Sequence, residues 1–301
     1  MALIERTNAE ALIPEGEVQE IFKSVAETSV AMQLLTRLPN MTSNKTRIKV
    51  EESLPLVYWQ AGDTAFKKTT TMKWKNKYLY AEEIAVIIPI SEAVLEDAEY
   101  DIWGEVKPKI VEAISATFDS AVFFGTNKPA NFPEGIVTQA STKGFSLEQG
   151  DLTLYGVLNE LMGKVETAGY DVTGVVGGPS VKKDFRNLLD KNGQLIVGDE
   201  ISALPRYIMK NGAWKNNEAR LILGDFKEGV FALRQDVTYK LLTEGVIQDP
   251  DTKEILYNLA QQDMVALRVV FRIGWQLPNP VNALAPNEEA RLPFAILEPN
   301  A

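Results

Sequence analysis

The chain has 301 residues, of which 45% are hydrophobic and 24% are charged, and its formal net charge is -10. It contains no cysteine and no histidine, which excludes disulfides, thiol nucleophiles, Cys/His zinc sites and a Ser-His-Asp triad. The acidic balance also weighs against binding of nucleic acid through its phosphates, because that mode needs clustered Lys and Arg.

The length and composition suit a soluble protein with two lobes. No run approaches the roughly 18 to 20 apolar residues that a membrane span needs. The N-terminus lacks the basic and then apolar order of a signal peptide. We therefore expect no membrane association and a location in the cytoplasm.

Residues 1–45 are predicted to form a loose segment followed by an amphipathic helix. Apolar residues, including Val18 and Phe22, recur at helical spacing between Glu15 and Leu38. Two interpretations remain open for this region. It is either a helix packed on its own core or an arm that grips a neighbouring subunit.

Residues 56–82 are predicted to form a long two-stranded hairpin with a turn at 61–63. Its second strand alternates between an aromatic face, which includes Trp74, and a face of three lysines, Lys73, Lys75 and Lys77. An isolated hairpin of this length is marginal in water, so its aromatic face must rest on something.

Three interpretations of the hairpin are open. It covers the core of its own subunit, it reaches a neighbour whose acidic helix meets the lysines, or the lysines stay in solvent and deter unwanted strand pairing. The candidates for contact between subunits are Val18, Phe22, Trp59, Lys67, Lys68, Lys73, Trp74, Lys75, Lys77, Glu96, Asp97 and Glu99.

An apolar strand at 82–90 leads into a long helix, predicted from an N-cap at Ser91 to a stop at Gly125. The apolar residues of this helix follow the i, i+3, i+4, i+7 spacing, which predicts one dry stripe. Pro108 cannot donate a backbone hydrogen bond, so we expect a kink or a short break near Gly104. A helix of this length is predicted to be the spine of the protein.

The second half of the chain is predicted to hold an inserted lobe at 151–262. A loop with a short strand at 135–138 precedes it. The lobe itself is predicted to contain two helices and several short strands. The strands predicted in it are at 172–176, 219–224, 230–234 and 238–242.

Two final strands, at 264–277 and 292–297, need partners, and the unpaired candidates lie near Thr46 and Glu83. This pairing predicts a discontinuous first lobe.

No stretch supports a catalytic, cofactor or metal site, so we expect no enzymatic activity. The two glycines at 177 and 178 lie between a strand and a helix but lack the phosphate-loop and dinucleotide spacings. The segment 249–254 lacks most ligands of a calcium loop and is better explained as a hairpin turn. One covalent possibility is an amide cross-link from a hairpin lysine to Asn279 or Asn282, which requires a desolvated lysine.

The order of these elements resembles the major capsid proteins of tailed double-stranded DNA bacteriophages, which have the Hong Kong 97-type fold. The sequence is similar at VYWQAGD, YLYAEEIAVIIPISEAVLEDAEYDIW, VVGGPSVKKDFRNLLDKNGQLI and MVALRVVFRIGWQLPNP followed by PFAIL. The resemblance covers nearly the whole chain. It implies an α+β fold with an N-terminal arm (1–45), an E-loop hairpin (56–82), a P domain (46–55, 83–150 and 263–301, with the spine helix at 91–125) and an A domain (151–262).

The resemblance further implies a structural subunit of an icosahedral phage head. Such a subunit assembles into pentamers and hexamers, encloses the double-stranded DNA genome, and works with portal and scaffolding proteins. It is located in the virion after assembly in the host cytoplasm. No long segment precedes the arm, so scaffolding is expected from a separate protein, and the cross-link is not carried over.

Two alternatives stay open. One is the shell protein of an encapsulin-like nanocompartment with the same fold. The other is an unrelated soluble acidic enzyme, which would need a deep pocket that holds acids of raised pKa.

Overall fold

A computed structural model describes residues 24, 25, 27–60, 66–97, 102–188, 194, 200–249 and 251–299. Val18, Phe22, Glu99 and the predicted turn at 61–63 lie outside the described residues. The helices are α2 (Val30–Leu34), α3 (Glu92–Asp97), α4 (Ile102–Phe124), α5 (Ile136–Thr142), α6 (Leu154–Thr167), α7 (Val181–Arg186), α8 (Glu200–Ala203) and the 3-10 turns η3 (Phe226–Glu228) and η4 (Glu288–Ala290). The strands are β1 (Thr36–Arg37), β2 (Lys45–Ser53), β3 (Lys73–Tyr80), β4 (Glu82–Ser91), β5 (Ser146–Leu147), β6 (Gly174–Gly177), β7 (Arg206–Ile208), β8 (Leu221–Gly224), β9 (Val230–Leu242), β10 (Val246–Gln248), β11 (Ile255–Asn258), β12 (Met264–Gln276) and β13 (Phe294–Leu297).

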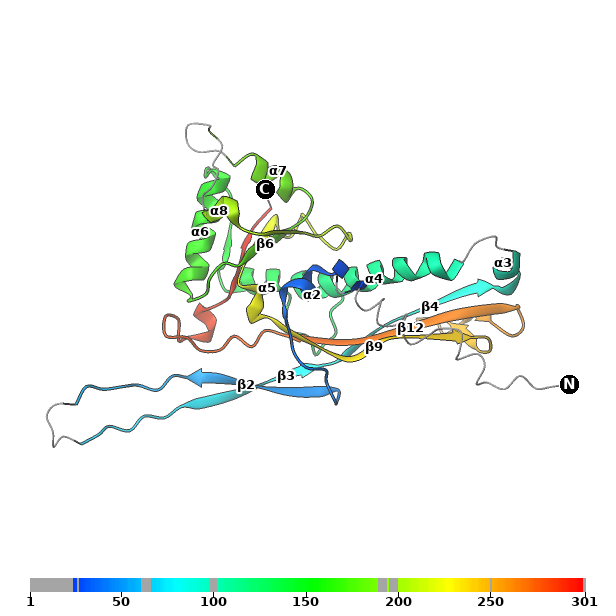
Figure 1. The fold of residues 1–301 in the computed structure, drawn as a ribbon, viewed down its shortest axis with the longest axis horizontal. Coiled ribbons are helices and arrows are strands. Elements are labelled where there is room, and N and C mark those ends of the chain that lie inside the picture. Colours follow the sequence, from blue (N-terminus) through cyan, green and yellow to red (C-terminus); the bar gives the residue numbers. More distant parts are fainter. Residues whose placement is uncertain are drawn as a thin grey trace.

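A long four-stranded sheet and the helix α4 run side by side through the middle of the molecule (Figure 1). The sheet has the order β1-β9-β12-β4. Strand β12 pairs antiparallel with the whole length of β4, from Met264 opposite Ser91 to Ile273 opposite Glu82. The predicted pairing of the late strand with the early strand near Glu83 is therefore confirmed.

The second sheet has the order β5-β13-β8-β6-β7 and carries α6, α7 and α8 around it (Figure 1). Its central strands β6, β8 and β13 are buried at every position, as expected for strands covered on both faces. Helix α6 begins at the N-cap Thr153, whose side chain accepts from the backbone N–H of Gly156. It packs the apolar face that the sequence predicted, including Leu158, Leu161 and Val165.

Two strands lie in a different sheet from the one that the sequence predicted. Strand β13 pairs with β8 and β5, so the final strand does not return to the region near Thr46. Strand β9 pairs with β12, so residues 230–242 belong with the four-stranded sheet although they were placed in the lobe 151–262. Both errors have one cause: strand pairing is set by distant partners, which a local pattern does not reveal.

Strand β9 is also one strand of 13 residues where two short strands were predicted. Its pairing with β12 shifts register around Arg272. Such a bulge interrupts the alternation of side chains without ending the strand. The polar residues at the bulge therefore look like a turn in the sequence.

The predicted spine helix is two helices in the described residues. Helix α4 continues through Pro108, so the break expected near Gly104 is wrong. Ser91 is the last residue of β4 and directly precedes α3, which begins at Glu92. The predicted stop is confirmed, because Gly125 follows α4 with a φ of 68°, the left-handed conformation that glycine adopts without steric cost.

The dry stripe is correct only in the second half of the predicted helix. No residue of α3 is buried, and Val94 is exposed. In α4 the buried face contains Phe118 and Val122 as predicted, but it also contains Ser115 and Asp119. These two polar residues are buried because they bind the N-terminal segment that crosses α4.

Helix α2 is fastened to α4 by a carboxylate. Asp119 accepts from Ser29 Oγ at 2.6 Å, from Ala31 N at 3.0 Å and from Val30 N at 3.1 Å. It also accepts from Asn211 Nδ2 at 2.7 Å, so three distant segments meet at one side chain. Burial raises the pKa of Asp119, and the hydrogen bonds that it accepts act against that rise.

Two further local predictions are wrong. The helix predicted to end at Leu38 ends at Leu34, because Thr36–Arg37 pairs in parallel with β9. The strand predicted at 135–138 is the start of α5, which buries Ile136, Val137 and Ala140 at helical spacing. Short apolar runs of this kind do not distinguish a strand from a helix.

Candidate assembly surface

A two-stranded hairpin arm projects from the body (Figure 1). We use this name for β2, β3 and the residues between them. The two strands pair antiparallel from Lys45 opposite Tyr80 to Ser53 opposite Lys73. The paired part thus lies nearer the body than the predicted hairpin at 56–82, because β2 supplies the first strand and residues 54–60 and 66–72 contain none.

The base of the arm is packed and its far part is exposed. Leu79 and Val50 are buried, and Leu79 packs with Met41, Ala81 and Ala232 in a small core of its own. Beyond Pro55 the chain has neither a strand partner nor a core to rest on in the described residues.

Large apolar side chains are concentrated at the far end of the arm. Val57 is 93% exposed, Phe66 is 99% exposed and Trp59 is fully exposed. Leu56 and Tyr58 beside them are also exposed. A dense group of exposed apolar side chains on one projecting segment is typical of a surface that binds another protein.

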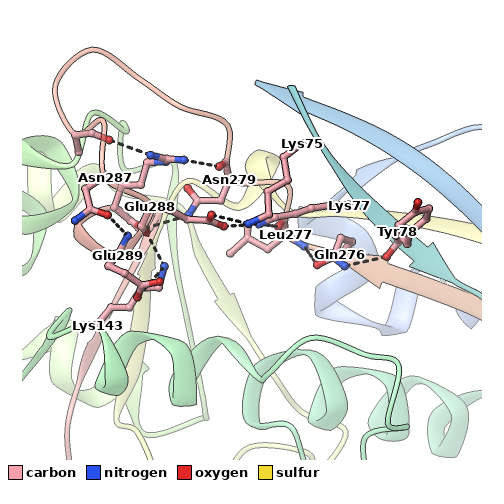
Figure 2. A network of polar contacts seen from close by, with 12 residues as sticks. Lys75, Lys77, Tyr78, Lys143, Gln276, Leu277, Asn279, Asn287, Glu288 and Glu289 are labelled. Carbon is pink, nitrogen blue, oxygen red and sulfur yellow. Dashed lines mark hydrogen bonds and ion pairs between the residues drawn. The ribbon is translucent and has the colours of Figure 1, made fainter. Parts of the chain in front are cut away.

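The lysine face of the arm is held by its own subunit. Lys77 Nζ lies 2.9 Å from Glu288 Oε1, and Lys75 Nζ lies 3.1 Å from Glu288 Oε2 (Figure 2). Lys77 Nζ also donates to the backbone oxygen of Leu277 at 3.2 Å. Lys75 and Lys77 are therefore paired with a carboxylate of their own subunit, as in the interpretation that the hairpin rests on its own subunit.

Glu288 is ionised in this arrangement. Burial by itself would raise the pKa of Glu288, but the hydrogen bonds and charges of Lys77 and Lys75 outweigh it and lower the pKa to about 2. Burial lowers the pKa of Lys77, and Glu288 acts against that shift. The two groups therefore form a charge-assisted pair that is partly shielded from water.

Helix α3 forms an exposed acidic surface at the opposite end of the long sheet (Figure 1). Glu96 and Asp97 are exposed on it, as is Glu92 in its first turn. Val94 lies among them with 55% of its surface exposed. This surface combines negative charge with an apolar side chain, the complement of a basic and apolar tip.

The predicted contact residues divide into three groups. Trp59, Lys67 and Lys68 lie on the exposed far part of the arm, and Lys68 Nζ lies over the ring of Tyr58. Lys73 and Trp74 are exposed on β3, and Glu96 and Asp97 are exposed on α3. Lys75 and Lys77 are tied to the body.

Sequence reasoning missed Glu288 and Phe66. Glu288 lies 211 residues from Lys77 along the chain, and no local pattern marks it as a partner. Phe66 was hidden in a run predicted to be an ordinary strand, where an aromatic residue is expected to pack.

The two asparagines considered for a cross-link have internal roles. Asn279 is 3% exposed and accepts from Tyr170 Oη at 2.7 Å. Asn282 Nδ2 donates to the backbone oxygen of Ala168 at 2.7 Å. Both side chains hold the loop that carries Glu288.

Catalytic features are weak in the described residues. Two hollows have volumes of about 490 and about 200 Å³. Burial raises the pKa of Asp119 and Glu228, but neither carboxyl group lines these hollows. Within the same part of the chain, no group of three or more acidic side chains is arranged to hold a metal ion, and no helix is long and apolar enough to cross a membrane.

Comparisons with known proteins agree with this geometry. The Phage capsid family matches residues 9–286. The major capsid protein of Staphylococcus phage 80alpha is 26% identical over 267 residues, which are 86% of this chain and 79% of that protein.

Two solved structures are similar over essentially the whole chain. A chain from Microbacterium phage Oxtober96 has a TM-score of 0.80 and 32% identity, and the match covers 99% of this chain and 100% of that one. A chain from Mycobacterium phage Adephagia has a TM-score of 0.80 and 28% identity, with 100% and 99% covered. These matches decide against the encapsulin-like and enzymatic alternatives, and the mixed α+β fold is that of phage capsid structures. The chain therefore belongs to the Phage capsid family, and it is a structural subunit of a phage capsid shell.

Proposed function

We propose that the chain has the Hong Kong 97-type organisation and forms pentamers and hexamers of an icosahedral head. In this proposal residues 1–45, which include α2 and β1, are the N-terminal arm, the hairpin arm is the E-loop, and α4 with β4, β9 and β12 is the P domain. The five-stranded sheet and its helices are the A domain. The head encloses double-stranded DNA, is built in the host cytoplasm with portal and scaffolding proteins, and the finished subunit resides in the virion.

The observation that supports assembly through the arm is its exposed apolar tip. Burying a Val, Phe or Trp side chain contributes about 1.5–3 kcal/mol. Val57, Trp59 and Phe66 together would therefore contribute roughly 5 kcal/mol or more to one contact. A shell repeats the contact around closed symmetry, so a modest energy per contact is sufficient.

The partner that we propose for the tip is the α3 surface of a neighbouring copy. Lys67 and Lys68 would face the acidic residues Glu96 and Asp97, while the apolar tip side chains would cover Val94. Lys73, which is exposed at the start of β3, would join this contact. The acidic balance of the whole chain suits a container, because a wall that binds phosphate tightly would hold back DNA moved inside by a motor.

The first test removes the apolar tip without touching a packed residue. We expect Trp59→Ser combined with Phe66→Ser to leave thermal unfolding unchanged, because both side chains are exposed. The concentration needed for particle formation should rise at least about 100-fold, since each 1.4 kcal/mol is tenfold. Leu152→Ser is the matched control, because it also replaces an exposed apolar side chain, but one that lies outside the arm.

Assembly is followed by sedimentation and negative-stain microscopy. Regular closed particles from the double variant at wild-type concentration would overturn the proposal that the tip carries the contact. A charge exchange tests the partner surface: Lys67→Glu with Lys68→Glu should weaken assembly, and adding Glu96→Lys with Asp97→Lys should restore it. Failure of the exchange to restore assembly would place the docking surface elsewhere.

A further inference from the structure

Apart from the small core around Leu79, a few polar contacts join the hairpin arm to the body. Strands β2 and β3 form a sheet of their own and share no strand ladder with the rest of the protein in the described residues. Gln276 Nε2 donates to the backbone oxygen of Tyr78 at 2.9 Å, and the backbone N–H of Val281 donates to the backbone oxygen of Glu51 at 3.1 Å. Everything beyond Lys75 depends on this short region for its orientation.

Glu288 is the side chain of the body that binds two positions of the arm at once. Its two carboxylate oxygens bind Lys75 and Lys77, which lie on the same face of β3. Its backbone oxygen accepts at 2.7 Å from Nζ of Lys143, the C-cap residue of α5 (Figure 2). One residue therefore connects the arm, the loop before β13 and a helix of the body.

The loop that carries Glu288 is rigidly supported. Arg291 is 3% exposed and donates to the backbone oxygens of Pro286 at 2.8 Å and Asn279 at 3.1 Å. Asn287 caps the turn η4 by accepting from the backbone N–H of Glu289. A carboxylate on a fixed support can hold two flexible lysines in one place, which a carboxylate on a mobile loop cannot.

We propose that Glu288 is a positioning residue that sets the angle at which the hairpin arm leaves the body. It acts through Lys75 and Lys77, while the tip residues make the contact between subunits. The consequence for shells rests on the proposed function: the angle of the arm decides which point of a neighbouring copy the tip reaches. The angle itself is a property of the single subunit and is measured without assembly.

The absence of cysteine makes a direct measurement possible. Thr71→Cys places one spin label on the arm, farther from the body than Lys75 and Lys77, and Glu160→Cys places a second label on α6. Both positions are exposed. Pulsed electron paramagnetic resonance then gives the distance distribution between arm and body. The measurement uses the full chain below the concentration at which particles form.

We expect Glu288→Gln to broaden this distribution or to shift its mean, because glutamine lacks the charge that binds both lysines. Glu289→Gln is the matched control: Glu289 lies in the same turn, is 78% exposed in its side chain and lies 4.0 Å from Lys143. Its distribution should equal that of the parent. A Glu288→Gln distribution with the parent's mean and width would overturn the proposal.

A second set of variants distinguishes the ion pairs with the lysines from a general loss of packing around Glu288. If Glu288 acts through them, Lys75→Met with Lys77→Met should give the same broadening, and adding Glu288→Gln should change nothing more. Additive effects would contradict the proposed mechanism. Particle formation is scored separately. If Glu288→Gln broadens the distance distribution but the parent chain never forms shells, the positioning role of Glu288 is supported and the proposed function is rejected. If Glu288→Gln leaves the distribution unchanged and the parent chain forms normal shells, the positioning role is rejected and the proposed function is supported.

Discussion

Asp119→Ala tests the attachment of the N-terminal segment to α4. The substitution leaves Ser29 Oγ, Val30 N and Ala31 N without their acceptor, and these three residues are buried. Each buried donor left unpaired costs about 1–3 kcal/mol. Asn211 is only partly buried and turns to water at little cost.

Three donors at about 1–3 kcal/mol each sum to about 3–9 kcal/mol, and partial relaxation places the expected loss of unfolding free energy near the lower end, at about 3–5 kcal/mol. The assay is denaturant unfolding of the unassembled chain, followed by circular dichroism. Asp97→Ala, on the exposed face of α3, should stay within about 0.5 kcal/mol of the parent.

Asp119→Asn refines the test. Asparagine keeps the shape of the aspartate side chain and one acceptor oxygen, but its NH₂ group replaces the other oxygen and would face the donor groups of α2. We expect a loss of about 2 kcal/mol, smaller than that of the alanine variant. A change below about 1 kcal/mol for Asp119→Ala would show that the hydrogen bonds do not hold α2 in place.

Three further predictions follow from the conformation and the shifted pKa values. Gly125→Ala should destabilise the chain by about 1–2 kcal/mol in thermal unfolding, because Gly125 has a φ of 68° and an added Cβ would lie 3.2 Å from Gly135 N; an unchanged melting temperature would contradict this. The pKa of Glu288 is lowered from 4.5 to about 2, so its ion pairs stabilise the fold above pH 4.5, and that contribution is lost as the pH falls toward 2. Glu288→Gln lacks the titrating group, so its free energy of unfolding should fall less between pH 4.5 and pH 2 than that of the parent. The same loss in both proteins would refute this prediction. Burial raises the pKa of Tyr170 from 10.0 to about 12, so its neutral form stabilises the fold below pH 10, and that contribution is lost as the pH rises toward 12. Tyr170→Phe should lower the free energy of unfolding by about 1–2 kcal/mol at neutral pH, because Asn279 loses its donor. Urea unfolding between pH 10 and pH 12 should show a smaller loss of stability for this variant than for the parent.

The assembly surface was only partly predictable. Trp59, Lys67 and Lys68 were predicted on hairpin strands that contact a neighbouring subunit; they are exposed in a part of the arm that forms no strand, and their contact role stays a prediction. The roles of Lys75 and Lys77 were not predictable, because an alternating strand looks the same whether its lysines face a neighbour, solvent or a carboxylate of their own subunit. The partner in that choice is Glu288, which lies at the other end of the chain.

The sequence by itself determined the long strand at 264–276, the stop of α4 at Gly125 and the apolar face of α6, because each depends on local periodicity or on the conformation of one residue. It also determined the absence of cysteine and histidine chemistry. Only the tertiary structure decided that β13 joins β8, that β9 joins β12, and that Asp119 and Glu288 are the side chains that fasten distant segments. Pairings of this kind depend on which surfaces meet in space, and the free energy that selects them comes from burial and hydrogen bonds between residues far apart in the chain.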